Sequence, residues 1–157
     1  MRTHRPDVPF IYDEDETFSF GKFKHLIDGE DLVIVTSGYM VHVVKQAIET
    51  LEAQAGLVAG LIDVYSLPIE PDSMNEILQI GDDCRGQILV VEDNYLGGLA
   101  DEIAEAAAAS DQGVMVDSLV LRNIPKSART PEEMLSLVHL SVDEIIKAAQ
   151  KMFDQSE

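Results

Sequence analysis

The chain has 157 residues, of which 46% are hydrophobic and 25% are charged, and this length fits one domain with at most a short arm. Its 29 acidic residues outnumber 11 basic ones and give a formal net charge of −18 at pH 7. Such a chain repels phosphate backbones and anionic lipid, so we expect no nucleic acid and no membrane surface as its partner. The one cysteine, Cys84, excludes an intrachain disulfide and indicates a reducing compartment, most simply the cytoplasm.

Residues 1–20 are predicted to form an extended arm or interdomain linker, which leaves 21–157 as the folded domain. Pro6 and Pro9 interrupt any helix, and the acidic run 13–16 resists burial. Several large apolar side chains interrupt this polarity, namely Phe10, Ile11, Tyr12, Phe18 and Phe20. An arm with so many aromatic residues is expected to pack on a surface, either of this domain or of a neighbour.

From Leu32 onward, short apolar runs alternate with amphipathic segments. The run Leu32–Val35 predicts a strand buried on both faces. A one-sided helix follows and stops at Gly56; its apolar face carries Met40, Val43, Val44, Ala47 and Leu51.

The same unit then repeats along the chain. The next strand is predicted at Leu61–Tyr65, with a helix from Pro71 that ends before Gly81. A third strand, Ile88–Val91, leads through Gly97 and Gly98 into a helix with an alanine-rich inner face. Val114–Leu121 is expected to be the last and longest strand.

Two further helices are marked by capping boxes, in which a hydroxyl residue precedes a glutamate by three positions. They begin at Thr130 and Ser141. Their inward faces are predicted to carry Met134, Leu135 and Val138 in the first helix and Ile145, Ile146 and Ala149 in the second. Strand–helix alternation of this kind predicts an α/β three-layer sandwich: a mostly parallel sheet with helices on both faces, as in Rossmann-like folds.

Candidate site residues follow from this topology, because ligands of open α/β sheets bind at the carboxyl ends of the strands. The candidates after the predicted strands are Ser37, Gly38, Glu92, Asp93, Asn94, Tyr95, Gly97 and Gly98. One interpretation is a small anion or nucleotide at a helix N-terminus. No phosphate-binding glycine motif is present, however, and two carboxylates would repel a phosphate. A structural role is favoured instead, with a Gly-Gly turn and Asp93 or Asn94 as a helix cap. Glu92 and Asp93 are adjacent on an extended chain and point to opposite faces, so a helix cap or an interface salt link is favoured for them over a general acid–base pair.

No catalytic, cofactor-binding or metal-binding residue can be assigned. The four histidines, including His42 and His139, lack the spacing of metal ligands. Aspartates flank Cys84 and disfavour its thiolate, and no nucleophile-elbow motif is present. Three basic residues lie after the last predicted strand: Arg122, Lys126 and Arg129. They could bind a carboxylate of a partner, but a solvated loop is the commoner explanation for such residues.

The segment from Gln87, QILVVEDNYLGGLADEIAEA, resembles the C-terminal domain of transketolase, with a buried strand, an acidic pair, an aromatic residue, Gly-Gly and an amphipathic helix. The resemblance extends back through RPDVPFIYDEDETFSFGKFKHLIDGEDLVIVTSG and forward through LVLRNIPKSARTPEEMLSLVHLSVDEIIKAA. The segment Arg122–Ser127 favours transketolase over the β-subunits of 2-oxoacid dehydrogenases and deoxyxylulose-phosphate synthase, which share the domain.

The resemblance implies a five-stranded, mostly parallel sheet with one antiparallel strand, for which Phe23–Ile27 is the best candidate. It implies a thiamine diphosphate enzyme that moves a two-carbon ketol unit between sugar phosphates. In that family, thiamine diphosphate and a divalent metal are held by two other domains across a dimer interface, and the Gly-Asp-Gly cofactor motif of those domains is missing here. We therefore expect no cofactor on this chain, thiamine-binding domains as its partner, a homo-oligomer in the complete enzyme, and no activity alone. Two alternatives stay open: a stand-alone regulatory module that binds a small molecule, and an interaction subunit of a 2-oxoacid dehydrogenase-like complex.

Overall fold

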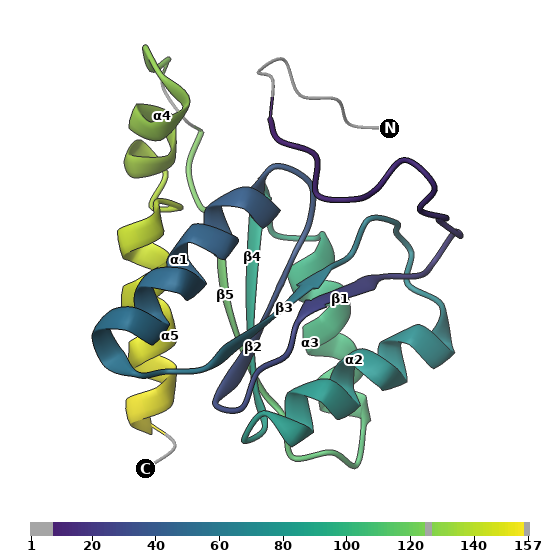
Figure 1. Ribbon diagram of the computed structural model, residues 1–157. Coiled ribbons are helices and arrows are strands. Elements are labelled where there is room, and N and C mark those ends of the chain that lie inside the picture. The colour runs from purple at the N-terminus through teal and green to yellow at the C-terminus, as the bar shows by residue number, and fades with distance from the viewer. Residues whose placement is uncertain (1–7, 125–126, 156–157) are drawn as a thin grey trace.

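The computed structural model describes residues 8–124 and 127–155. Five strands form one sheet in the order β1-β3-β2-β4-β5 (Figure 1). Their bounds are β1 (Lys24–Ile27), β2 (Leu32–Thr36), β3 (Ala59–Asp63), β4 (Gln87–Tyr95) and β5 (Met115–Leu121). Strand β1 pairs with β3 in the antiparallel direction, and the other three pairs are parallel. The predicted mixed sheet is confirmed, including the antiparallel strand near Phe23–Ile27.

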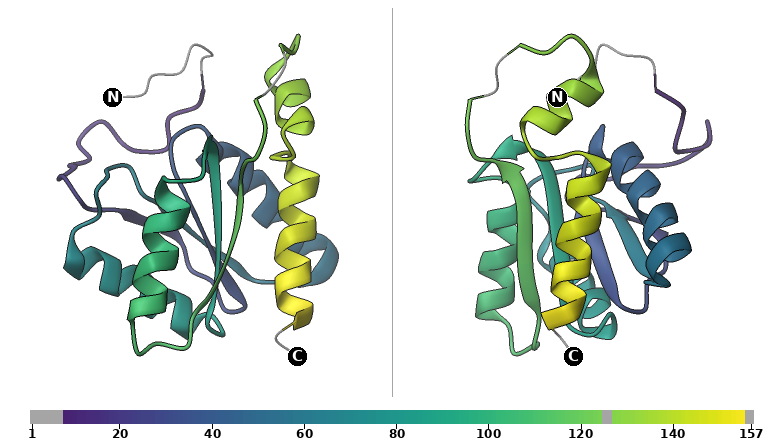
Figure 2. Two further views of the ribbon diagram at one scale, coloured as in Figure 1. Left: turned by 180° about the vertical axis from the view of Figure 1, so that it is seen from behind. Right: turned by 90° about the vertical axis from the view of Figure 1, so that its left-hand side faces the viewer.

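Helices cover both faces of the sheet, which completes the predicted three layers. The helices α1 (Met40–Ala55) and α5 (Val142–Gln155) pack together on one face. The helices α2 (Pro71–Asp83) and α3 (Leu99–Ala109) cover the other, as Figure 2 shows. The short helix α4 (Pro131–Leu137) lies beyond the end at which the parallel strands finish (Figure 1).

The core is divided by the sheet into two halves, and strand β2 contributes to both. Leu32 and Ile34 join the half under α1 and α5, whereas Val33 and Val35 join the half under α2 and α3. All four side chains are fully buried, because successive residues of a strand point to opposite faces and both faces are covered. This explains why the segment is apolar throughout.

Several boundaries differ from those expected from the sequence. Strand β3 spans Ala59–Asp63 and not Leu61–Tyr65, and β4 continues past Val91 to Tyr95. Helix α2 continues through Gly81 to Asp83, so Gly81 lies inside the helix and not beyond its end. A Cβ at Gly81 would lie 2.5 Å from Cγ1 of Ile88, so the glycine allows the helix to approach β4 closely. The longest strand is β4, with nine residues, and not the final strand.

The two helices with predicted capping boxes are present. In the first, the backbone N–H of Glu133 donates to Oγ1 of Thr130 at 3.2 Å. The predicted inward face of α4 is buried only in part, because Leu135 and Val138 are half-buried against the core. In α5, Ile145 and Ala149 are fully buried as expected. Among residues 8–124 and 127–155, no helix has the length and apolar character needed to cross a membrane.

Candidate functional site at the carboxyl edge of the sheet

The chain reverses its winding direction between β2 and β4, the two strands at the centre of the sheet. The connection after β2 leads through α1 to β3 on one side, whereas the connection after β4 leads through α3 to β5 on the other. The hydroxyl of Thr36 donates to the carbonyl of Val91 at 2.6 Å and joins the two strands near their ends. In α/β sheets such a switch point is where ligands bind.

The structure places all the sequence-predicted candidates at this edge. Ser37 and Gly38 form the turn between β2 and α1, and the segment from Glu92 to Tyr95 ends β4. Gly97 and Gly98 immediately precede α3. The two groups of candidates therefore flank the switch point from neighbouring strands.

Glu92 is the acceptor at the start of α3. Its side chain is 3% exposed, and its Oε2 accepts the backbone N–H of Leu99 at 3.1 Å. A Cβ at Gly98 would lie 2.8 Å from Oε2 of Glu92, so a glycine is needed for the carboxylate to reach the helix. Glu92, Asp93 and Asn94 were the candidates for a cap from the sequence; Glu92 fills this role, because β4 continues beyond it and returns the chain to α3 through the Gly-Gly turn.

Asp63 is a second buried carboxylate at this edge, and sequence reasoning did not select it. It ends β3, is 4% exposed, and its Oδ2 accepts the hydroxyl of Tyr12 at 2.5 Å. Burial raises the pKa of Asp63, while the Tyr12 hydroxyl and the nearby backbone N–H of Gly38 act in the opposite direction. Burial and the Asp63 carboxylate together raise the pKa of Tyr12.

The carboxylates of Asp63 and Glu92 bear on whether this edge of the sheet can bind an anion. Asp63 interacts with the backbone N–H of Gly38, two residues before α1 begins, while Glu92 occupies the start of α3. Helix N-termini bind anions through free N–H groups and the helix dipole. An incoming anion would meet the Glu92 carboxylate at the start of α3 and the Asp63 carboxylate near the start of α1, which argues against the anion-binding interpretation.

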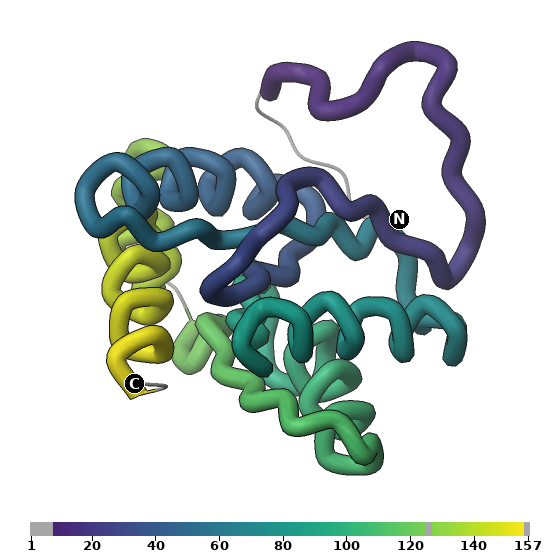
Figure 3. The backbone as a smooth tube through the Cα atoms, turned by 60° about the horizontal axis from the view of Figure 1, so that its bottom comes forward, coloured from purple at the N-terminus to yellow at the C-terminus, as the bar shows by residue number. Residues whose placement is uncertain are grey.

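The arm packs on this domain at the end of β3. The ring of Phe18 packs edge-to-face between those of Tyr12 and Tyr65, at centroid distances of 5.0 and 4.9 Å. The backbone N–H of Gly21 donates to Oγ of Ser66 at 3.0 Å. Figure 3 shows the described part of the arm as a wide loop outside the body of the domain. Phe10 in this loop is 99% exposed, so part of the arm's apolar surface is not covered by the domain.

From the sequence, Cys84 was considered as a nucleophile and the histidines as metal ligands, and the structure shows the surroundings of Cys84 and His42. Cys84 is buried, and burial together with Asp83 and Asp31 raises the pKa of its thiol, which disfavours the reactive thiolate. Burial also lowers the pKa of His42. Within the part of the chain that the structure describes, no group of three or more His, Cys, Asp or Glu residues could hold a metal ion. Lys126, one of the basic residues after the last strand, lies outside the described residues.

Exposed apolar side chains are present at this edge of the sheet. Four large hydrophobic side chains near the ends of β4, β5 and α4 are between 45% and 87% exposed: Tyr95, Leu96, Ile124 and Leu137. Tyr95 pairs in register with Leu121 of β5. Tyr95 and Leu96 at the end of β4 and Ile124 after β5 therefore follow the ends of neighbouring strands. We call these four residues the apolar edge patch.

The comparisons with known proteins agree on one family. The family model for "Transketolase, C-terminal domain" matches residues 21–145. Transketolase of Mus musculus is 29% identical over 152 residues, which cover 96% of this chain and 24% of that protein. The chain thus spans about a quarter of the length of the transketolases it matches.

Solved structures of transketolases are similar to this chain in fold. A structure described as a split gene transketolase, inactive beta4 tetramer, has a TM-score of 0.82 and 26% identity, over 96% of this chain and 48% of that one. Transketolase from Leishmania mexicana has a TM-score of 0.63 and 15% identity over 86% of this chain and 18% of its own, and shows the shared fold. With a family model that matches most of its length, the chain belongs to the transketolase C-terminal domain family.

Proposed function

We propose that this chain works as the C-terminal domain or subunit of a transketolase, in which two-carbon ketol units pass between sugar phosphates. Its contribution is structural, and it is inactive alone. The observation that carries this proposal is the likeness to a split-gene transketolase over 96% of the chain, at a TM-score of 0.82. In that protein the matching domain is part of a chain about twice as long, of which this chain covers 48%.

The arrangement of the strand ends supports a structural role. Glu92 and Asp63, the most deeply buried acidic groups at the switch point, accept hydrogen bonds from the chain itself. A cofactor diphosphate would be repelled at both positions. Thiamine diphosphate and a divalent metal, which the family implies for the complete enzyme, are therefore assigned to other domains.

The proposed partner is a chain, or the remainder of a longer protein, that carries the thiamine-binding domains. The apolar edge patch and the exposed ring of Phe10 supply the uncovered apolar surface that such a contact requires. The strand-end candidates, Ser37, Gly38 and the segment from Glu92 to Gly98, border this surface and are proposed to pack near the contact. The arm is proposed to be the connection to those domains, and the complete enzyme to be a homo-oligomer.

The alternatives raised by the sequence receive less support. A regulatory module built on the helix N-termini of the switch point conflicts with the carboxylates there, and the comparisons favour transketolase over 2-oxoacid dehydrogenase components. The single cysteine, Cys84, is buried and accords with the reducing environment of the cytoplasm, which we propose as the site of action.

A complementation assay tests the proposal. The chain is mixed with a transketolase from which the C-terminal domain has been deleted, and ketol transfer is measured with thiamine diphosphate and Mg²⁺. We expect transfer from the mixture and none from the chain alone. The variant Leu96→Glu should abolish complementation, because it introduces a charge into the apolar edge patch. Met115→Glu is the matched control, since Met115 is 41% exposed at the opposite end of the sheet. A mixture that forms no complex and gains no activity would refute the proposal.

A further inference from the structure

Strand β5 forms one edge of the sheet, and among the described residues it pairs with β4 alone. In the right-hand view of Figure 2, β5 faces the reader between α3 and α5. The outer side of an edge strand offers N–H and C=O groups with which another strand can pair. We propose that this edge is a strand-addition site for a second copy of the chain, and that Asp117 closes it. This inference does not depend on the proposed function.

The free edge is made by every second residue of β5. The backbone N–H of Met115 faces β4, because it donates to the carbonyl of Gly86 at 2.7 Å, directly before β4 begins. Backbone groups of successive residues in a strand point to opposite sides within the plane of the sheet. Those of Val116, Ser118 and Val120 therefore face away from β4.

Asp117 occupies the middle donor of this edge. Its Oδ1 accepts the backbone N–H of Ser118 at 2.7 Å, which makes that N–H unavailable to an incoming strand. Its Oδ2 lies 4.0 Å from Nζ of Lys151 on α5, and the Asp117 side chain is 47% exposed. A second strand would have to displace a charge-assisted hydrogen bond and strip water from the carboxylate. A charged side chain on an edge strand is a common means by which proteins prevent such pairing.

Apart from Asp117, β5 has the composition of a strand that pairs readily. Its sequence, MVDSLVL, contains no proline and no other charged residue. Only Val120 is buried, and every other residue of the strand keeps at least partial exposure. Its seven residues match or exceed the usual strand length of about five or six, which is enough for pairing along the whole edge. Within the strand, Asp117 is therefore the one charge that opposes pairing.

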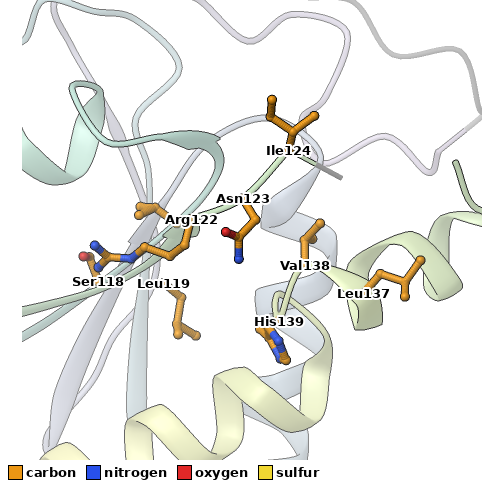
Figure 4. Close-up of a pocket in the computed structure, with 9 residues that line it drawn as sticks. Ser118, Leu119, Arg122, Asn123, Ile124, Leu137, Val138 and His139 are labelled. Carbon is orange, nitrogen blue, oxygen red and sulfur yellow. The ribbon is translucent and has the colours of Figure 1, made fainter. Parts of the chain in front are cut away.

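A second copy fits this edge because the outward residues are symmetric about Ser118. In an antiparallel pairing centred there, Val116 of one copy lies opposite Val120 of the other, and the two Ser118 residues lie opposite each other. All of these residues face outward, so each pair can exchange two backbone hydrogen bonds. Figure 4 shows the side chains of Ser118 and Leu119 on opposite faces of the strand. On the Leu119 face, each Asp117 would lie opposite Leu119 of the other copy, an apolar surrounding that disfavours the carboxylate.

Association of the full chain is measured by analytical ultracentrifugation over a range of concentrations, together with amide hydrogen exchange by NMR. In the unaltered chain we expect unprotected amides at Val116 and Val120. Asp117→Ala should strengthen dimerisation by about tenfold or more and should protect these two amides and that of Ser118. Asp111→Ala is the matched control, because it removes the same charge from an exposed residue ahead of β5. It should change the affinity by no more than about twofold, although the net charge of −18 repels a second copy in every variant.

A second variant, Asp117→Ala/Ser118→Pro, removes the middle N–H donor of the edge. That N–H faces away from β4, so proline breaks no hydrogen bond of the sheet, and the double variant should return to the association of the unaltered chain. The proposal is overturned if Asp117→Ala dimerises no more tightly than Asp111→Ala, if its edge amides stay unprotected in the dimer, or if the dimer survives the proline. Protected edge amides in the unaltered chain would also overturn it, since Asp117 would then not close the edge. If the proline variant does not fold, amide protection in Asp117→Ala decides the question.

Discussion

Replacing Glu92 with alanine tests whether this carboxylate secures the start of α3. The substitution removes a charged acceptor 3.1 Å from the Leu99 N–H and leaves that donor without its acceptor in a buried place. A hydrogen bond to a charged group contributes about 1.5–3 kcal/mol, and a negative charge at a helix N-terminus adds about 0.3–2 kcal/mol. We therefore expect Glu92→Ala to lower the free energy of unfolding by about 2–5 kcal/mol.

Urea denaturation followed by circular dichroism measures this loss. Glu105→Ala is the matched control, because Glu105 lies on the same helix with its side chain exposed, and its loss should stay within about 0.5 kcal/mol. Formate should then stabilise the Glu92→Ala variant more than the unaltered chain, since a small carboxylate would enter the vacated position at the helix start. The reasoning is refuted if Glu92→Ala costs no more than the control, or if formate stabilises both proteins equally.

Three further predictions concern the same edge. Gly98→Ala should destabilise the fold by about 1–3 kcal/mol and should cost less in the Glu92→Ala background, because its Cβ would lie 2.8 Å from that carboxylate; a double-mutant cycle by urea denaturation that shows additive losses would contradict this. Tyr12→Phe should cost about 1–3 kcal/mol in thermal or urea unfolding, because it leaves the buried Asp63 carboxylate without its 2.5 Å donor, and an unchanged midpoint would show that the arm contact is not formed. Burial raises the pKa of Asp63, so the folded state binds its proton more tightly than the unfolded state, and the stability that this proton provides is lost as pH rises through the folded pKa. Asp63→Asn should therefore gain stability relative to the unaltered chain as pH rises above about 4, the ordinary pKa of an Asp carboxyl, and a difference that stays constant with pH would oppose this assignment.

Much of the architecture could be predicted from local patterns. The stripe from Met40 to Leu51 and the apolar run at Leu32–Val35 encode their elements directly, because burial on one or both faces dictates those periods. Strand β1 has a half-exposed pattern without alternation, so only the family resemblance suggested it. A glycine such as Gly81 is typical of a helix end, but here it lies inside α2, where close contact with β4 requires a residue without a side chain. A contact between two separate elements leaves no local pattern in the sequence.

The strand-end residues were predicted in position, and their role only as a set of alternatives. Turn signals located the loop from Glu92 to Gly98 and left Glu92, Asp93 and Asn94 as cap candidates, and no local pattern distinguishes Glu92 from the other two. Glu92 reaches α3 from seven residues before Leu99 only because the chain reverses through Gly97 and Gly98. Asp63 carries no sequence signal beyond being a polar residue in an apolar strand, and its hydroxyl partner, Tyr12, is 51 residues away.

We propose that the reaction centre of the complete enzyme lies outside this chain, and calorimetric titration with thiamine diphosphate and Mg²⁺ distinguishes this from a centre within it. The isolated chain should give no saturable heat, whereas its complex with thiamine-binding domains should bind the cofactor. Micromolar binding of thiamine diphosphate by the isolated chain would show that the cofactor site lies within this chain.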